Sequence, residues 1–370
     1  MKVKQLFLAL VSLTLLSGCE MMTEDVDDTY CGLFVCFKYD YNLQRADMFK
    51  DHVGGVTLYV FNSEGTFIRS YENNNVPQMG TLLYDGTYAY TMRIDDLPDG
   101  EYRFVALATQ KSYDETLQTP GAKYRRTVLE TGDDDEDLMV TLDRTSLTSA
   151  TQPDYSEIKG LAMSAVSNAA PLDTLWHGMS GTDPIFVQRN SYTTTTISMT
   201  RDTKMLTIGL HNLDEDRTNI SYEDFDVYIF DRNGKLAYNN DLLQDDMLLY
   251  TPFHEWDTQS KDGYGNIVDA TAHFSTCFNR LLWHEKADKN ALLLIYNRHN
   301  GKQVAAINLT DFLAQGRNAY DQYAYSRQEY LDRSYDYYMD FFIKGDTWLY
   351  ADVRINVLSW AKRIQNVRFE

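Results

Sequence analysis

Short stretches in which hydrophobic and polar residues alternate follow one another along the chain from about residue 30 onward. Turn residues bound these stretches, and many of the 27 tyrosines lie within them. Aromatic and β-branched residues in alternation favour β-strands over helices. In the first part of the chain the pattern predicts strands at Leu33–Tyr41, Val56–Phe61, Phe67–Tyr71, Tyr88–Ile94 and Glu101–Ala108.

One pattern occurs twice. Residues 57–67 align without gaps on residues 226–236, and the two segments share their Tyr, Phe and Gly positions. Gly65 would supply the positive φ of a hairpin turn, and Gly234 holds the same position in the second segment. A long apolar strand precedes each copy, at residues 33–41 and 205–210. The chain is therefore predicted to be all-β, with two tandem β-sandwich domains of related topology.

The segment between the two copies is less regular. An acidic loop covers residues 131–137, and residues 146–153 are small and polar, so that either could be a linker. Short strands are expected at residues 172–178 and 185–188. We place the boundary near residue 189, which gives an N-terminal β-sandwich at 31–189 and a C-terminal one at 190–370.

The second domain departs from the strand pattern between residues 311 and 334. Apolar and long side chains recur there at helical spacing, which predicts a short helical insertion of one or two helices. Strands at residues 337–343 and 348–358 are then expected to close the domain.

The amino terminus has the organisation of a bacterial lipoprotein signal. Lys2 and Lys4 precede an apolar run at residues 6–16, and Ser17-Gly18 leads directly to Cys19. Residues 1–18 are expected to be removed and Cys19 to be lipidated, with residues 19–30 as an acidic, hydrated tether. An ordinary secretory signal cut elsewhere is the alternative.

The net charge of the chain narrows the classes of partner. The formal net charge is −20, and removal of the two lysines makes it more negative, so nucleic acid is not an expected partner.

Of the four cysteines, Cys19 would carry lipid, which leaves Cys31, Cys36 and Cys277. An odd number cannot pair completely; a bridge from either Cys31 or Cys36 to Cys277 stays open, and free buried thiols are the default.

No catalytic or metal-binding signature is found. No two of the seven histidines have the i, i+4 spacing of a zinc site, and there is no Cys-x-x-Cys. We therefore expect no catalytic residue, metal or cofactor. Two alternatives are kept: a hydrolase with two carboxylates across a cleft, and a glycan-binding surface lipoprotein whose exposed aromatic residues would include Trp256, Trp283 and Trp348.

Several segments together resemble one family. The lipobox and acidic tether, the strand at residues 31–42, the hairpin at 56–65, and the segments 197–208 and 352–360 are similar, in this order, to those of FimB-type fimbrial anchors. These are the fimbrillin-associated anchor lipoproteins of type V pili. The resemblance covers essentially the whole mature chain.

The resemblance implies transthyretin-like β-sandwiches and a non-enzymatic role at the base of a surface fibre. The expected partners are the membrane, through the amino-terminal lipid at the outer membrane, and the fimbrial shaft subunit of the same pilus, through strand exchange. An acceptor groove is expected at the first strand, with contacts from Leu33, Val35, Phe37 and Tyr39, while the strand at residues 351–360 would close the second domain.

Overall fold

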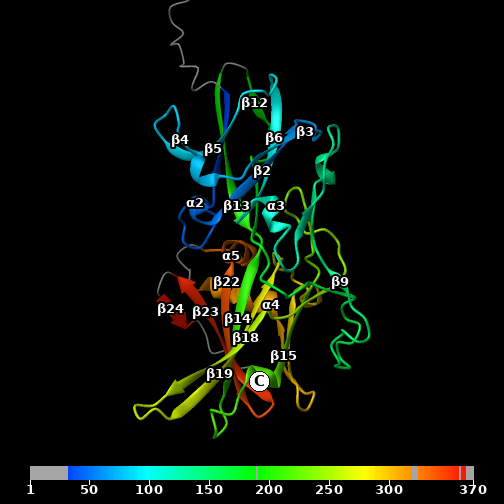
Figure 1. Cartoon of the computed structure of the whole chain (residues 1–370), viewed down its shortest axis with the longest axis vertical. Helices are drawn as coiled ribbons and strands as arrows, with labels where there is room; N and C mark the ends of the chain where they lie inside the picture. Colours follow the sequence, from blue (N-terminus) through cyan, green and yellow to red (C-terminus); the bar gives the residue numbers. More distant parts are fainter. Residues whose placement is uncertain (1–31, 189–190, 319–323, 358–359, 364–370) are drawn as a thin grey trace, which may run out of the picture.

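A computed structural model describes residues 32–188, 191–318, 324–357 and 360–363. It is an elongated assembly of β-sheets, with an N-terminal unit above and a C-terminal unit below (Figure 1). The prediction of an all-β fold is confirmed. The predicted signal peptide, Cys19, the tether and Cys31 lie outside the described residues.

A nine-stranded sheet forms the N-terminal unit. Its order is β3-β2-β6-β11-β13-β1-β5-β4, and β12 pairs with β6. Inward side chains of strands far apart in this order, such as Val60 and Phe37, belong to one core, so the sheet curls around it. The strands are β1 (Gly32–Lys38), β2 (Gly55–Asn62), β3 (Phe67–Asn73), β4 (Gly80–Leu82), β5 (Tyr88–Ile94), β6 (Gly100–Thr109), β11 (Leu175–Met179), β12 (Ile185–Val187) and β13 (Tyr192–Arg201).

Two six-stranded sheets form the C-terminal unit, ordered β21-β20-β15-β17-β10-β9 and β18-β19-β14-β22-β23-β24. Their apolar faces share one core. The strands are β9 (Thr145–Ser146), β10 (Ser164–Ala165), β14 (Lys204–Asn212), β15 (Phe225–Asp231), β17 (Leu248–Tyr250), β18 (His254–Lys261), β19 (Ile267–Phe278), β20 (Leu292–Asn297), β21 (Gln303–Asn308), β22 (Asp336–Lys344), β23 (Thr347–Val357) and β24 (Trp360–Arg363).

A fourth sheet, of three strands, joins the two units. Its order is β16-β8-β7, with β7 (Tyr124–Arg126) and β8 (Met139–Leu142) from the first half of the chain and β16 (Lys235–Ala237) from the second. The prediction that residues 226–236 repeat the hairpin of residues 57–67 is therefore wrong. β2 and β3 do pair, but β15 pairs with β17 and β20, and β16 pairs with β8. The large core correspondingly contains residues of both halves, such as Phe61 and Ile229.

Helices are short and few among the described residues. The predicted helical insertion is present as α4 (Leu309–Ala314) and α5 (Arg327–Arg333). Asn308 and Ser326 begin these helices by accepting the amides of Asp311 and Glu329. Other helical turns are α2 (Phe49–His52), α3 (Tyr113–Thr116), η2 (Val76–Gln78), η3 (Asp135–Asp137), η4 (Tyr222–Asp224) and η5 (Ala287–Lys289), and a further turn at residues 315–318 follows α4.

The junction of the two units is a short, buried polar segment. β13 pairs in the upper sheet and β14 in the lower one, and only Asp202 and Thr203 separate them. Lys204 is fully buried, and its Nζ donates to the carbonyls of Asp332 and Ser334 at 3.0 and 2.8 Å. Burial lowers the pKa of this amine. Because the sheet change lies after Arg201, we propose a boundary at residues 202–203 in place of one near 189.

Candidate functional site

The four residues predicted to contact a partner lie in the core. Leu33, Val35, Phe37 and Tyr39 are each 0 % exposed. Phe37 stacks on Phe49, and Tyr39 makes an edge contact with Trp176. Their alternating spacing, which suggested a groove, is that of the inward face of a central strand.

Both edges of β1, which carries Leu33, Val35 and Phe37 and ends one residue before Tyr39, are already paired. β1 runs parallel to β13 over its whole length and antiparallel to β5 from Leu33 to Phe37. No backbone edge is left for a partner's strand in this conformation. In this conformation the four side chains contact the protein's own core and are not available to a partner unless a neighbouring strand leaves, so an acceptor groove at this strand stays a prediction.

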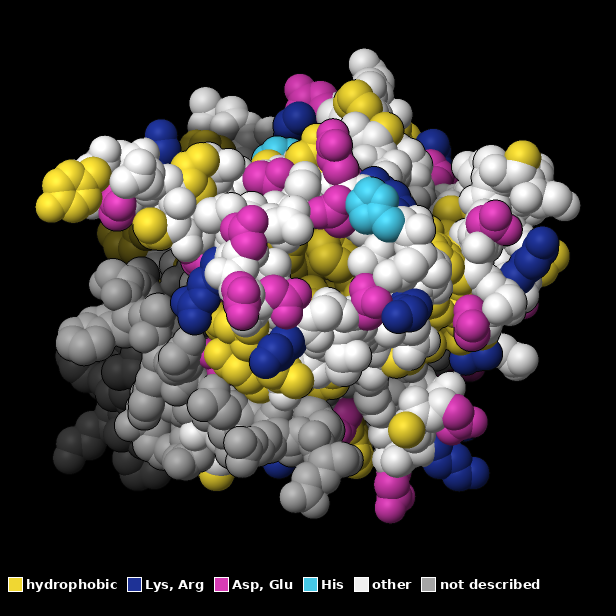
Figure 2. Space-filling view, turned by 90° about the horizontal axis from the view of Figure 1, so that it is seen from below, with side chains coloured by type: hydrophobic (Ala, Val, Ile, Leu, Met, Phe, Trp, Pro, Cys, Tyr) yellow, Lys and Arg dark blue, Asp and Glu magenta, His cyan; other side chains and the backbone are white. Residues whose placement is uncertain are grey.

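A free edge lies instead on the hairpin of β18 and β19. β18 is the last strand of its sheet, and the hairpin extends away from the body at the lower end of the molecule (Figure 1). Near its tip, Tyr264, Ile267 and Val268 are 94 %, 41 % and 48 % exposed. Acidic and hydrophobic side chains are interspersed on this lower face (Figure 2).

The three tryptophans proposed for glycan binding do not share a surface. Trp256 is on β18, and Trp348 is on β23, four positions along the same sheet or about 19 Å away at 4.8 Å per strand. Trp256 stacks between His254 and His273 at 4.5 and 4.9 Å, so neighbouring rings cover its faces. Trp283 lies under the Arg327 guanidinium. The prediction of a tryptophan platform is not supported by this arrangement.

Neither described cysteine forms a disulfide. Cys36 is buried and Cys277 is partly buried, and both are free thiols. Burial raises the pKa of Cys277 to about 11. These two cysteines are therefore packing residues rather than cross-links.

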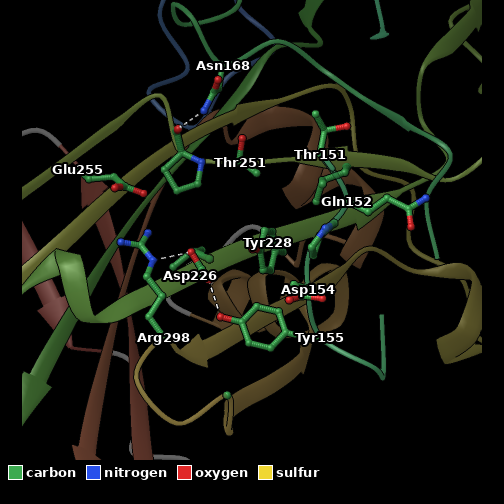
Figure 3. Close-up of a pocket in the computed structure, with 15 residues that line it drawn as sticks. Thr151, Gln152, Asp154, Tyr155, Asn168, Asp226, Tyr228, Thr251, Glu255 and Arg298 are labelled. Carbon is green, nitrogen blue, oxygen red and sulfur yellow. Dashed lines mark hydrogen bonds and ion pairs between the residues drawn. The ribbon is translucent and has the colours of Figure 1, made fainter. Parts of the chain in front are cut away.

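A polar pocket of about 550 Å³ lies on the outer face of the C-terminal unit (Figure 3). It is bounded by the ends of several strands and by the segment 147–163 between β9 and β10, which we call the arm. The arm is fixed to the sheet because Ile158 and Ala162 join a core with Phe230 and Leu294. The lining residues are Thr151, Gln152, Pro153, Asp154, Tyr155, Asn168, Asp226, Val227, Tyr228, Leu249, Thr251, Pro252, Glu255, Arg298 and Gly301.

A hydrogen-bonded network holds one wall of this pocket. The Asp226 carboxylate accepts from the Tyr155 hydroxyl at 2.5 Å and from Arg298 Nε at 2.7 Å (Figure 3). Tyr155 also stacks on Tyr296 with ring centroids 4.0 Å apart and lies edge-on to Tyr228. These contacts fix the side chains before any ligand arrives.

Burial shifts the acid–base properties of the same groups. Desolvation, together with Asp226, raises the pKa of Tyr155 and of Tyr228, so both hydroxyls keep their protons. Desolvation also raises the pKa of Glu255, while Arg298 opposes this shift. Among the described residues, no hydrogen bond is made to the Glu255 carboxylate. It is therefore available to a ligand.

Sequence reasoning missed this pocket, because its residues are separated by long stretches of chain. Residues 146–153, which contribute to it, have the composition of a linker. One signal was present: Asp226 and Tyr228 alternate with buried Val227 and Ile229, so the outward face of β15 carries an acid and an aromatic ring. The pairing of that face with Tyr155 and Arg298 is not visible in the sequence.

Metal-binding clusters and membrane-spanning helices are both absent from the described ranges. No group of three or more His, Cys, Asp or Glu side chains there could hold a metal ion. No helix within those ranges is long and apolar enough to cross a membrane.

Comparison with solved structures gives full-length matches. A candidate polysaccharide-binding protein from Bacteroides thetaiotaomicron is 29 % identical, with a TM-score of 0.64 over 90 % of this chain and 98 % of that one. A candidate adhesin from the same organism is 24 % identical, with a TM-score of 0.67 over 90 % and 99 %. The fimbrial anchor protein Mfa2 from Porphyromonas gingivalis shares the fold at 12 % identity, with a TM-score of 0.53 over 90 % and 99 %.

Comparison with curated sequences gives no match. A family model does match, over residues 25–366, which is nearly the whole chain. Its description is that of anchor proteins associated with a fimbrial subunit, in agreement with the resemblance noted in the sequence. The chain therefore belongs to the family of fimbrillin-A associated anchor proteins, Mfa1 and Mfa2.

Proposed function

We propose that this protein is a lipid-anchored fimbrial subunit that holds or caps a surface fibre at the outer membrane. The observation that carries the proposal is the family match over residues 25–366, which begins just after the predicted lipidation site at Cys19. Acyl chains on that residue would supply the attachment, at about 0.8 kcal/mol for each buried CH₂. The protein is not proposed to be an enzyme.

The positions of the amino-terminal segment and of the β18–β19 hairpin at opposite ends of the molecule support this role. Gly32, where the described chain begins, donates its amide to the carbonyl of Ser191, in the segment between β12 and β13. β12 lies at the upper end of the N-terminal unit (Figure 1). The hairpin of β18 and β19 lies at the other end. A tether at Gly32 would keep the upper end near the membrane and turn the hairpin toward a fibre.

We propose that the shaft subunit docks on this hairpin by adding a strand to the free edge of β18. Strand addition satisfies the unpaired N–H and C=O groups of an edge strand, and exposed apolar side chains beside the edge add contact area. Tyr264, Ile267 and Val268 are such side chains.

Replacement of Cys19 tests the anchor. The Cys19→Ala protein should appear in the medium, together with any attached fibre, with an unchanged melting temperature because residue 19 precedes the folded units. Fractionation and immunoblotting of cells measure this. Retention of the variant in the membrane fraction would contradict lipid anchoring.

A double variant tests the docking surface separately. Tyr264→Ser with Val268→Lys should reduce the shaft subunit recovered with the membrane-bound protein at least 10-fold. Val128→Lys, at a side chain that is 89 % exposed in the N-terminal half, is the matched control. If the double variant and Val128→Lys lose the shaft subunit equally, the hairpin is not the docking surface.

Carbohydrate binding is a second candidate function. The specific observation that favours it is the polar pocket with its two tyrosines, and the 29 % identical relative described as a candidate polysaccharide-binding protein supports it. An anchor that also binds glycans would combine attachment of the fibre with adhesion.

A further inference from the structure

We infer that the pocket between the arm and strands β15, β17 and β18 binds a neutral saccharide. The inference rests on the second candidate function, carbohydrate binding, and specifies where the ligand lies and what charge it carries. It is independent of the fibre contact.

The size and form of the pocket suit a small ligand. Its volume of about 550 Å³ lies within the range of about 300–1,000 Å³ that is usual for small-molecule sites. Residues of the arm form one side, and the ends of the strands form the other (Figure 3). A chain of two or three sugar rings could lie along this open hollow.

The mixture of polar groups fits hydroxyls better than ions. Gln152, Thr151, Asn168 and Thr251 line the pocket together with Glu255. Asn168 Nδ2 already donates to the Pro252 carbonyl and Thr151 Oγ1 accepts from the Thr148 amide, both at 2.8 Å, so their remaining amide oxygen and hydroxyl lone pair, with Gln152, Thr251 and Glu255, are the groups open to a ligand. A sugar hydroxyl both donates and accepts, so it can satisfy donors and acceptors side by side, whereas a cation needs only acceptors. This mixture favours a polyhydroxylated ligand.

The negative charge of the lining residues excludes an acidic ligand. Asp154, Asp226 and Glu255 line the pocket with a single cation, Arg298, and Arg298 is already paired with Asp226 at 2.7 Å. A uronate or a sulfated sugar would meet uncompensated carboxylates without a free cation to bind it. The ligand is therefore neutral.

The aromatic groups supply the apolar part of recognition. Tyr155, which has one ring face on Tyr296, and Tyr228 are held edge to face with centroids 6.1 Å apart, and Pro153 and Pro252 lie among the lining residues. The C–H faces of a pyranose can pack on such surfaces at a low cost in conformational entropy, because these side chains are already immobilised.

Trisaccharides of equal size and different charge test the proposal. The full-length protein in detergent is titrated calorimetrically with galactotriose, maltotriose and mannotriose, with trigalacturonate as the acidic probe and triglucosamine as the cationic probe. At least one neutral trisaccharide should bind, and the acidic probe should bind at least 10-fold more weakly.

Two conservative variants locate the site. Glu255→Gln keeps the shape of the side chain and removes its charge, and it should weaken neutral-sugar binding about 10-fold, because hydrogen bonds to a charged group are stronger than neutral ones. Tyr155→Phe removes only the hydroxyl that holds Asp226 and should weaken binding several-fold. Tyr264→Ser, on the distant hairpin tip, should have no effect.

The possible outcomes distinguish an error in the position of the site from an error in the proposed carbohydrate binding. Neutral-sugar binding that both pocket variants leave unchanged would overturn this site and leave carbohydrate binding intact. A preference for triglucosamine that Glu255→Gln abolishes would overturn the neutral charge inferred for the ligand and assign a cationic one. If none of the probes binds, both the site and the second candidate function are overturned.

Discussion

The two segments that look alike in the sequence, residues 57–67 and 226–236, have different structures. In the first, β2 turns directly into β3, and Gly65 has a φ of +95° at the turn. In the second, the chain leaves β15 and reaches β8 of the other half of the molecule. Gly234 does not have a positive φ; a Cβ there would lie 2.5 Å from Arg144 Nη2 and 2.6 Å from Asp245 Oδ2. The same glycine spacing thus serves a turn in one place and close packing in the other.

The residue before each glycine distinguishes the two segments most strongly. Glu64 is exposed, but the aligned Asn233 is fully buried. Asn233 donates to the carbonyls of Asn279 and Arg280 at 3.0 and 3.1 Å and accepts from Tyr250 at 2.6 Å. It therefore joins three parts of the C-terminal unit.

The largest predicted effect comes from Asn233→Ala. It should lower the free energy of unfolding by about 3–5 kcal/mol, because several buried groups would lose their partners at about 1–3 kcal/mol each. Glu64→Ala should change it by less than about 0.5 kcal/mol. Denaturant titration of both variants measures the contrast, and similar costs at the two positions would show that they have similar roles after all.

The next prediction concerns pH and the aligned pair Asn62 and Asp231. Burial raises the pKa of Asp231 to about 7. Well below pH 3.8, the ordinary pKa of an aspartate, the carboxyl is protonated in both folded and unfolded states. As the pH rises from about 4 to about 7, only the unfolded state ionises freely, so stability falls by about 1.4 kcal/mol for each pKa unit of the shift.

Asp231→Asn should therefore be more stable than the parent protein at pH 8 and equally stable at pH 3.5. Thermal unfolding across this range measures the difference. Asn62→Asp is the control, since Asn62 Oδ1 accepts the amides of Glu64 and Thr66 in a half-exposed turn and a carboxylate can do the same. A parent protein whose stability does not fall between pH 4 and pH 7 would contradict the prediction.

The smallest effect is expected at the turn glycine. Gly65→Ala should cost about 1–2 kcal/mol, the usual penalty for an L-residue in a left-handed conformation. Gly132 has a φ of +108°, and a Cβ added there would meet nothing within 4 Å, so Gly132→Ala gives the conformational cost alone. If Gly65→Ala costs more stability than Gly132→Ala, the difference measures the crowding of the new Cβ against Asp135 Oδ2, which would lie 2.9 Å from it. If Gly65→Ala costs nothing, the turn does not need its glycine.

The sequence predicts individual strands well and their partners poorly. Alternation located β2, β5 and β6 within one or two residues, because the inward face of a strand must be apolar. It could not show that β13 would pair with β1, or β16 with β8, since such contacts join residues about 100 or more positions apart. The pocket depends on this long-range pairing and for that reason was not predicted, apart from the outward Asp226 and Tyr228.

The parallel pairing of β1 with β13 has a mechanical consequence. Both strands run from the upper end of the molecule toward the junction, and β14 continues from β13 into the lower unit. A pull applied at Gly32 against a load on the lower unit acts along these strands. It would have to shear the whole β1–β13 and β1–β5 ladders at once instead of opening hydrogen bonds one by one, so the fold resists extension along the axis on which a fibre would pull.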